Sequence, residues 1–403
     1  MDSPPIRDGA VAIAGDKILA SGTQADVQRA YPQGVVQDLG DVVLLPGLVN
    51  PHTHLELSDL KQGDKPESFV GWIMNLMGQT ARAGTAVPEQ VQNAVKVGVA
   101  QCMKFGVTSV GDISKQCMHS RPILRDGPLR VVSYGEIQAM AQRRGLLDER
   151  FAAASDISQD SEFLRVGVTP HAPYTVEPEG YARCVAFARS ENRPLATHLA
   201  ETPDETIFLE NQTGAFRQLW ELGVKAWDEH VPKYTGGPIR FARDVDLLSI
   251  PTLLAHVNYC DDDELQILAG GKASVVYCPR THDYFGHPPH RWREMLAAGI
   301  NVAVGTDSCA SSPDLNLVDE LRLLRKLAPD IPAIDLWAAA TTRAAKAICM
   351  GGRVGSIGPG KCADLVAFPI HQSETPLETI LDEPILPTGV WINGKPFGVP
   401  VSA

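Results

Sequence analysis

The chain has 403 residues, of which 44 % are apolar and 21 % are charged, as in ordinary globular proteins. Its formal net charge of −12 argues against nucleic acid as a partner, which would need a basic face. No apolar stretch approaches the roughly 18 residues of a membrane span, and no secretory signal is visible. The eight cysteines form no Cys-x-x-Cys pair, which indicates reduced thiols and a cytoplasmic protein.

Both ends of the chain predict a small β domain. Residues 9–22 are expected to form a hairpin with Gly15-Asp16 as its turn, and residues 363–368 and 389–391 are expected to form further strands. We therefore expect a β-sandwich domain composed of residues 1–45 and 350–403. Residues 46–349 would form a separate, larger domain.

The central region alternates short apolar runs with segments of helical periodicity. Continuous apolar runs are typical of parallel strands that are covered on both faces. Strand and helix in alternation, eight times over, is the order of a (β/α)8 TIM barrel. The eight predicted strands are residues 42–46 (leading to His52), 108–113, 129–136, 164–169, 194–198, 252–256, 273–278 and 301–305.

Polar residues follow or end several of these runs. His52, His54, His198 and Asp307 are candidate metal ligands, and His256 ends another run. The carboxyl ends of all strands meet at one rim of such a barrel, so these residues can converge on a single ion. Side chains two apart in an extended segment project to the same side, which suits the His-x-His pair. Each residue alone could equally be a surface or capping residue with no role in metal binding. Together they predict a metal hydrolase.

Glu201 lies three residues after His198, where the chain enters a loop. A carboxylate beside metal-activated water can accept a proton and pass it to a leaving group. A solvated loop glutamate is the alternative.

The motifs resemble those of the amidohydrolase superfamily, and within it the cytosine-deaminase-like branch. That branch includes guanine deaminases, adenosine-type nucleoside deaminases and triazine hydrolases. Relatives usually have one more strand before Asp8-Gly9, so this chain would begin short or carry a trimmed edge. The matching segments are Pro46-Gly47-Leu48-Val49-Asn50-Pro51-His52-Thr53-His54, Thr197-His198-Leu199-Ala200-Glu201, Ala255-His256, Gly305-Thr306-Asp307-Ser308 and residues 9–22 and 355–366.

The resemblance implies a single metal ion. Two-metal relatives use a lysine at the end of strand four, where this chain has Pro170-His171. His52, His54, His198 and Asp307 would hold one divalent ion; zinc fits this donor set, and iron(II) accepts the same ligands. His256 would orient the attacking water and Asp307 would share in holding its proton. Glu201 would carry that proton to the substrate, so Glu201, His256 and Asp307 are the predicted catalytic residues.

The sequence gives weaker evidence for the residues that select the substrate than for the metal ligands. Each has a structural alternative, such as a loop carboxylate, a helix-face tryptophan or a solvated arginine. Relatives usually have asparagine where His282 stands. The histidines at 282, 287 and 290 could bind a second metal, but Pro288-Pro289 and the irregular spacing favour substrate or packing roles. The candidate substrate-binding residues are Glu56, Trp72, Arg143, Arg144, His171, Arg280 and His282.

We therefore expect a deaminase acting on a small aromatic heterocycle. Leu55-Glu56-Leu57-Ser58 and Phe69…Trp72 resemble deaminases of adenine-bearing nucleosides, such as adenosine, S-adenosylhomocysteine or aminodeoxyfutalosine. The benzoate of aminodeoxyfutalosine would require an arginine. The alternatives are a triazine chloro- or amino-hydrolase, a cyclic amide hydrolase and a non-catalytic scaffold relative. The sequence allows a homo-oligomer without predicting one.

Overall fold

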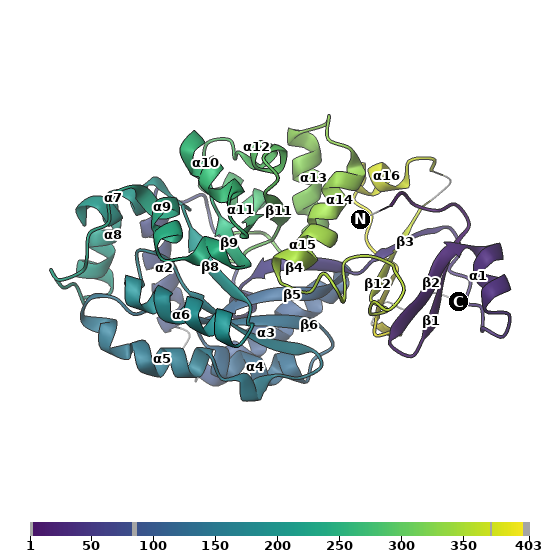
Figure 1. The fold of residues 1–403 in the computed structure, drawn as a ribbon, viewed down its shortest axis with the longest axis horizontal. Coiled ribbons are helices and arrows are strands. Elements are labelled where there is room, and N and C mark those ends of the chain that lie inside the picture. Colours follow the sequence, from purple (N-terminus) through teal and green to yellow (C-terminus); the bar gives the residue numbers. More distant parts are fainter. Residues whose placement is uncertain (1–2, 83–86, 371–372, 398–403) are drawn as a thin grey trace.

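The computed structural model describes residues 3–82, 87–370 and 373–397. The predicted (β/α)8 barrel is confirmed, because eight strands form one parallel sheet in the order β11-β10-β9-β8-β7-β6-β5-β4. Figure 1 shows the helices around this sheet. The barrel strands are β4 (Leu48–Thr53), β5 (Val107–Ser114), β6 (Arg130–Ile137), β7 (Leu164–Pro170), β8 (Leu195–Leu199), β9 (Thr252–His256), β10 (Ser274–Tyr277) and β11 (Asn301–Val304).

The barrel closes between its first and last strands at the rim that carries the candidate ligands. Thr53 pairs with Asp307 in a parallel bridge. Asn50 Nδ2 donates to Thr306 Oγ1 at 2.7 Å, and the Thr306 N–H donates to Asn50 Oδ1 at 3.2 Å. These bonds hold the carboxyl ends of β4 and β11 together.

The predicted first barrel strand at residues 42–46 is wrong. That segment is β3 (Val42–Pro46), which pairs antiparallel with β12 (Leu365–Pro369) outside the barrel. Gly47 divides the long apolar run, and β4 begins at Leu48. A Cβ atom at Gly47 would lie 2.2 Å from Thr108 Oγ1, so only glycine allows the chain to pass β5 so closely at this point. Apolar character alone could not show where one sheet ends and the next begins.

The terminal segments form the predicted β structure beside the barrel. A hairpin of β1 (Gly9–Ala14) and β2 (Lys17–Thr23) turns at Gly15-Asp16. A four-stranded sheet has the order β14-β13-β12-β3, with β13 at Gly389–Ile392 and β14 at Lys395–Phe397. Figure 1 places both near the two chain ends. Residues 1–2, 371–372 and 398–403 of the predicted domain lie outside the described residues, and its boundaries at residues 46 and 349 stay a prediction.

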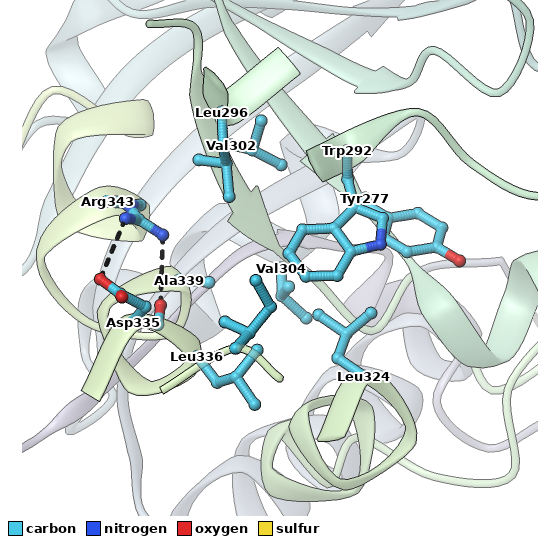
Figure 2. Close-up of a pocket in the computed structure, with 11 residues that line it drawn as sticks. Tyr277, Trp292, Leu296, Val302, Val304, Leu324, Asp335, Leu336, Ala339 and Arg343 are labelled. Carbon is cyan, nitrogen blue, oxygen red and sulfur yellow. Dashed lines mark hydrogen bonds and ion pairs between the residues drawn. The ribbon is translucent and has the colours of Figure 1, made fainter. Parts of the chain in front are cut away.

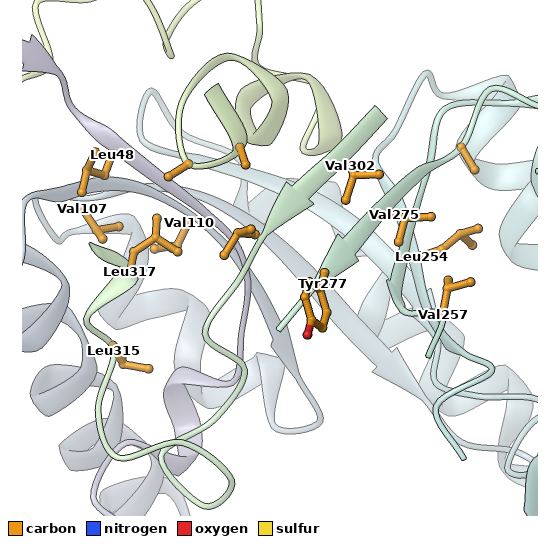
Figure 3. Close-up of a cluster of buried hydrophobic side chains, with 14 of the residues drawn as sticks. Leu48, Val107, Val110, Leu254, Val257, Val275, Tyr277, Val302, Leu315 and Leu317 are labelled. Carbon is orange, nitrogen blue, oxygen red and sulfur yellow. The ribbon is translucent and has the colours of Figure 1, made fainter. Parts of the chain in front are cut away.

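Strand residues are buried on both faces of the barrel wall. Leu253 and Ala255 of β9 pack in one cluster with β4 and α15, whereas Leu254 packs in another cluster against the surrounding helices. Alternate side chains point to opposite faces of a strand, which accounts for this division. Figure 3 shows part of the larger cluster, which includes Leu48, Val110, Val275 and Val302 of the barrel strands and Leu317 of α13.

The helices surround the barrel or extend its loops. In the described part of the chain, no helix is long and apolar enough to cross a membrane. The helices are α1 (Gln24–Ala30), α2 (Phe69–Arg82), α3 (Val87–Lys104), α4 (Cys117–Arg125), α5 (Leu147–Ala154), α6 (Pro178–Ser190), α7 (Pro203–Asn211), α8 (Gly214–Gln218), α9 (Gly237–Asp244), α10 (Asp262–Ala269), α11 (Pro279–Phe285), α12 (Trp292–Ala297), α13 (Leu317–Leu327), α14 (Ala333–Ala339), α15 (Thr342–Ala347) and α16 (Pro376–Asp382). Short helical turns are η1 (Leu55–Leu57), η2 (Ala141–Leu146), η3 (Ile157–Gln159), η4 (Leu219–Gly223) and η5 (Leu247–Ser249).

A small apolar pocket lies between β10, β11 and helices α12 to α14 (Figure 2). Trp292, Val302 and Leu336 line it, and Arg343 pairs with Asp335 at 3.5 Å on one side. None of the candidate metal ligands lines this pocket. It is a packing feature of the outer barrel wall.

Candidate metal and active site

The five strand-end residues that the sequence singles out lie together at one rim of the barrel. His52 lies in β4, His54 follows it, His198 lies in β8, His256 ends β9 and Asp307 follows β11. Two groups of side chains bring their ligand atoms within 4.8 Å of one another: His52, His54 and His198, and His52, His256 and Asp307. The structure therefore brings together residues that are far apart in the sequence.

The distances are those of a compact donor cluster. Asp307 Oδ1 lies 3.7 Å from His52 Nε2 and 3.6 Å from His54 Nε2. His54 Nε2 lies 3.3 Å from His198 Nε2. His52 is fully buried, whereas the side chain of His54 is 13 % exposed, so the cluster has an open side.

The protonation of these side chains suits a metal ion. His198 Nδ1 lies 3.2 Å from the carbonyl oxygen of His171. Because a carbonyl only accepts, Nδ1 carries the proton and Nε2 keeps its lone pair. Neither ring nitrogen of His52 has a hydrogen-bond partner among the residues described. Imidazole lone pairs that converge with a carboxylate form a typical donor set for a divalent ion, so these residues fit one.

Burial favours the neutral form of His52, His198 and His256. Desolvation, together with neighbouring histidines, lowers the pKa of His52 and of His198 well below the usual value. Desolvation also lowers the pKa of His256 to about 4, although Asp307 opposes this shift. Neutral imidazole is the form that binds metals, because its lone pair is free.

The backbone at the rim adopts strained conformations. Ala200, His256 and Asp307 all have positive φ values, of 51°, 72° and 58°. Such values cost energy in residues other than glycine and occur often where side chains must be aimed at a site. Ser311 Oγ donates to Asp307 Oδ2 at 2.9 Å and fixes the carboxylate.

Glu201 lies beside the donor cluster. Its Oε1 is 3.4 Å from His256 Nε2. Desolvation raises its pKa well above the usual value, and the negative charges of Asp307 and Glu205 add to this shift. A carboxylate whose pKa is raised is a stronger base than an ordinary glutamate, which suits a group that has to accept a proton.

The comparisons with known proteins agree with this geometry. Residues 43–396 match the amidohydrolase family. This chain belongs to the amidohydrolase family. Residues 9–33 also match a bacterial imidazolonepropionase-like composite domain, which suits the terminal β structure beside the amidohydrolase barrel.

Two curated relatives cover most of the chain. One is a 5-methylthioadenosine/S-adenosylhomocysteine deaminase of Nitratidesulfovibrio vulgaris, 27 % identical over 383 residues, which are 90 % of this chain and 80 % of the relative. The other is an aminodeoxyfutalosine deaminase of Deinococcus radiodurans, 29 % identical over 369 residues, which are 88 % of this chain and 84 % of the relative.

Solved structures share the whole fold. Helicobacter pylori aminofutalosine deaminase in complex with methylthio-coformycin has a TM-score of 0.85 at 25 % identity, covering 97 % of this chain and 95 % of that one. An adenosine deaminase of Xanthomonas campestris with bound zinc has a TM-score of 0.81 at 26 % identity, covering 96 % and 88 %. An atrazine chlorohydrolase of Arthrobacter aurescens, with a TM-score of 0.79 at 19 % identity over 98 % and 92 % of the chains, shares the fold alone.

Within this amidohydrolase site, His171 lies beside the candidate metal ligand His198. Its ring centroid is 4.9 Å from that of His198. Thr175 Oγ1 donates its proton to the Ala172 carbonyl at 3.1 Å, so it accepts from His171 Nδ1 at 2.8 Å. The proton of the neutral ring is thus on Nδ1, and Nε2 is left as an acceptor.

Glu56 and Trp72 are engaged by the protein itself. The Glu56 carboxylate accepts from Ser114 Oγ at 2.6 Å and from the N–H groups of Lys115 and Gln116 at 3.0 and 2.9 Å. Both oxygens are therefore used to join the loops after β4 and β5, which favours the structural alternative. Trp72 of α2 donates to the Ala310 carbonyl at 3.3 Å, so it packs close to the loop that carries Asp307.

The three candidate arginines differ in their partners. Arg144 pairs with Glu177 at 3.0 Å and with Asp228. Arg280 pairs with Glu320 at 2.6 Å and with Asp314 at 2.8 Å. Arg143, in contrast, has no carboxylate partner within the part of the chain described, and its guanidinium donates to the Val224 carbonyl at 3.4 Å.

The histidines at positions 282, 287 and 290 are spread over one side of the site. They form no three-ligand metal group among the residues that the structure describes. His290 Nε2 donates to the His256 carbonyl at 2.9 Å, and its ring stacks on Tyr277 with centroids 4.1 Å apart. His282 is buried, and its Nε2 has no hydrogen-bond partner in the described ranges.

Sequence reasoning missed the residues that hold the site in place. Glu205, Asn258 and Ser311 contact Glu201 or Asp307 and are buried. Of these three, only Glu205 could have been found from the sequence. Thr202-Pro203-Asp204-Glu205 has the spacing of a capping box at the start of α7.

Proposed function

We propose that this amidohydrolase is a metal-dependent hydrolytic deaminase that converts an amino-substituted aromatic heterocycle to its oxo product and ammonia. The observation that carries the proposal is the buried carboxyl group of Glu201 placed 3.4 Å from His256, beside the cluster of His52, His54, His198 and Asp307. The relatives that are named deaminases support the same conclusion.

His52, His54, His198 and Asp307 would hold the ion. Their convergence and the free lone pairs support this assignment. The ion supplies the acidity of a water molecule, whose pKa falls from about 15.7 to about 7 at such sites. We propose zinc, because a related adenosine deaminase has zinc bound; iron(II) is the alternative with the same ligands.

Glu201 is the proposed proton carrier. It takes a proton from the attacking water and delivers it to a ring nitrogen, while the water oxygen bonds to the amino-bearing carbon. It then delivers the second proton to the amine, which leaves as ammonia as the carbonyl forms. His256 orients the water, and Asp307 shares in holding its proton. The neutral state of His256 supports this role, because its ring then keeps one donor and one acceptor nitrogen.

An adenine-type nucleoside is the proposed substrate, since relatives over most of the chain are named for such compounds. His171 would contact it, because its Nε2 is an acceptor that can receive a hydrogen bond from a substrate N–H or O–H group. Trp72, His282 and Arg143 are the further proposed contacts. Arg144 and Arg280 are already paired with carboxylates, which makes Arg143 the candidate for an acidic substituent.

The test is a substrate panel. Purified protein with its metal is assayed for ammonia with adenosine, 5-methylthioadenosine, S-adenosylhomocysteine and aminodeoxyfutalosine, and for chloride with a chlorotriazine. We expect ammonia from at least one nucleoside and no chloride. Chloride release without nucleoside deamination would favour the triazine hydrolase alternative, and no turnover of any compound by the metallated protein would contradict the proposal.

A further inference from the structure

Glu205 is a fully buried carboxyl group that the proposed reaction does not use. It lies in the first turn of α7 and is 0 % exposed. Among the residues described, no lysine, arginine or histidine forms an ion pair with it, and its Oε1 has no hydrogen-bond partner. A buried carboxyl group without a cation costs several kcal/mol, so its other contacts must offset that cost.

Those contacts are to the main chain of Glu201. Glu205 Oε2 accepts from the Glu201 N–H at 3.0 Å, and the main chain of Ala200 lies close enough to oppose the rise in the pKa of Glu205. Ala200 has a positive φ of 51°. A left-handed residue lets successive N–H groups point to one side, where they form a small concave site for an oxygen acceptor. The carboxyl group of Glu205 fills this site and holds the chain in the strained turn.

A second buried side chain holds the other end of the same residue. Asn258 Nδ2 donates to the Glu201 carbonyl at 3.0 Å. Asn258 lies two residues after His256, and the Tyr259 N–H donates to the Ala200 carbonyl at 3.2 Å. The main chain of Glu201 is therefore held on both sides, and one tether comes from the segment that carries His256.

We propose that Glu205 is a positioning residue which, together with Asn258, fixes the main chain of Glu201 so that its carboxyl group stays within reach of His256 and of the reacting proton. This inference rests on the proposed function, because it assigns a task to Glu201. It predicts a loss of kcat without a loss of substrate or metal binding.

A plain capping role for Glu205 is the alternative. In a capping box the residue at the third helical position bonds the N–H of the cap residue, here Thr202. Glu205 occupies that position, but its carboxyl group bonds the N–H of Glu201 instead. The Thr202 side chain caps α7 by accepting from the Asp204 N–H at 3.4 Å. The two roles therefore predict different behaviour of variants at 202 and 205.

The experiment compares kcat, KM and metal content of the metallated enzyme in four variants. Glu205→Leu removes the acceptor at similar volume, and we expect kcat to fall about 100-fold, the cost of a misplacement of about 1 Å. KM and metal content should stay at the wild-type level. Glu205→Gln keeps one acceptor oxygen and should recover most of kcat. Asn258→Ala should lower kcat at unchanged KM, and Thr202→Ala should lower the melting temperature but keep kcat.

Combination with Glu201→Gln provides an independent check. If Glu205 acts through Glu201, Glu205→Leu should lower the residual kcat of Glu201→Gln no further, since residues that act as a unit are not additive. Should Glu205→Leu fail to fold, Glu205→Gln and Asn258→Ala carry the same comparison. A wild-type kcat in Glu205→Leu or in Asn258→Ala would overturn the inference while leaving the deaminase assignment intact. A wild-type enzyme that deaminates nothing would overturn both.

Discussion

The N–H of Asp307 donates a hydrogen bond to the carbonyl oxygen of His52 at 3.1 Å. This bond joins the segment after the last barrel strand to the first strand, so a contact that closes the barrel also brings Asp307 beside His52. A metal ligand at each side of the seam also means that ion binding should stabilise the closed barrel. The first two predictions concern this site.

Glu201→Gln should retain the metal and the substrate affinity but lose nearly all turnover. The amide keeps the shape of the side chain and cannot carry a proton, and general acid–base groups contribute about 100- to 10,000-fold to the rate. The measurement is kcat for ammonia release beside metal content by elemental analysis. Turnover within tenfold of wild type would remove Glu201 from the proton relay.

Removal of the metal should abolish activity and lower the melting temperature together. A chelator-treated sample is titrated with zinc and, separately, with iron(II) under anaerobic conditions, and both quantities are followed. His198→Ala should neither bind the ion tightly nor respond to it, because it lacks a ligand lone pair. Full activity in the metal-free protein would contradict the proposed chemistry.

Glu205 should make the protein less stable as the pH rises. Burial raises its pKa from 4.5 to about 8, so between these values the folded protein holds a proton that the unfolded chain has lost. The free energy of unfolding should then fall with increasing pH, by at most about 1.4 kcal/mol for each pH unit. Urea unfolding at pH 5 and pH 8 (roughly the limits of that window) should show a smaller difference for Glu205→Gln than for wild type. Glu210→Gln, on the same helix, should keep the wild-type difference.

Arg143→Ala should discriminate between substrates. Arg143 lacks a carboxylate partner within the described residues, so its charge is available to an acidic substituent. We expect KM to rise about tenfold for a nucleoside that carries a carboxylate and to stay unchanged for adenosine, since one charged hydrogen bond contributes about 1.5 to 3 kcal/mol. Arg144→Ala is the matched control, because its ion pairs with Glu177 and Asp228 leave it occupied. Equal effects of both variants on both substrates would contradict this.

Asp364→Asn should destabilise the junction between the barrel and the terminal sheet. Arg130 of β6 pairs with Asp364 at 2.6 Å, and the two side chains are 0 % and 2 % exposed. Removal of one partner from a buried pair leaves an uncompensated charge, so unfolding by denaturant should show a loss of about 3 kcal/mol. Asp335→Asn breaks the more exposed pair with Arg343 in Figure 2 and should cost less than about 1 kcal/mol. A similar loss of unfolding free energy in Asp364→Asn and Asp335→Asn would contradict the stabilising role proposed for the buried pair.

The sequence by itself determined the barrel and the composition of the cluster. Hydrophobic runs and helical periodicity are local properties, and a barrel brings all strand ends of one polarity together. His198, His256 and Asp307 could therefore be placed at one rim from their positions at or just after the ends of predicted strands, whereas the strand predicted before His52 was the wrong segment. The motif around Glu201 could also be recognised from the sequence, because its functional residues lie at the end of a strand or directly after it.

Only the tertiary structure decided how side chains that are distant in the sequence pair with one another. It showed that the Glu56 carboxylate accepts hydrogen bonds from Ser114 and its neighbours. It also showed that Arg144 and Arg280 form ion pairs with carboxylates, and that Glu205 accepts a hydrogen bond from the Glu201 N–H. It also divided the apolar run around Gly47 between two sheets. The local hydrophobic pattern of the sequence predicts which residues are buried. The partner of a buried polar group, in contrast, depends on which loops the fold brings side by side.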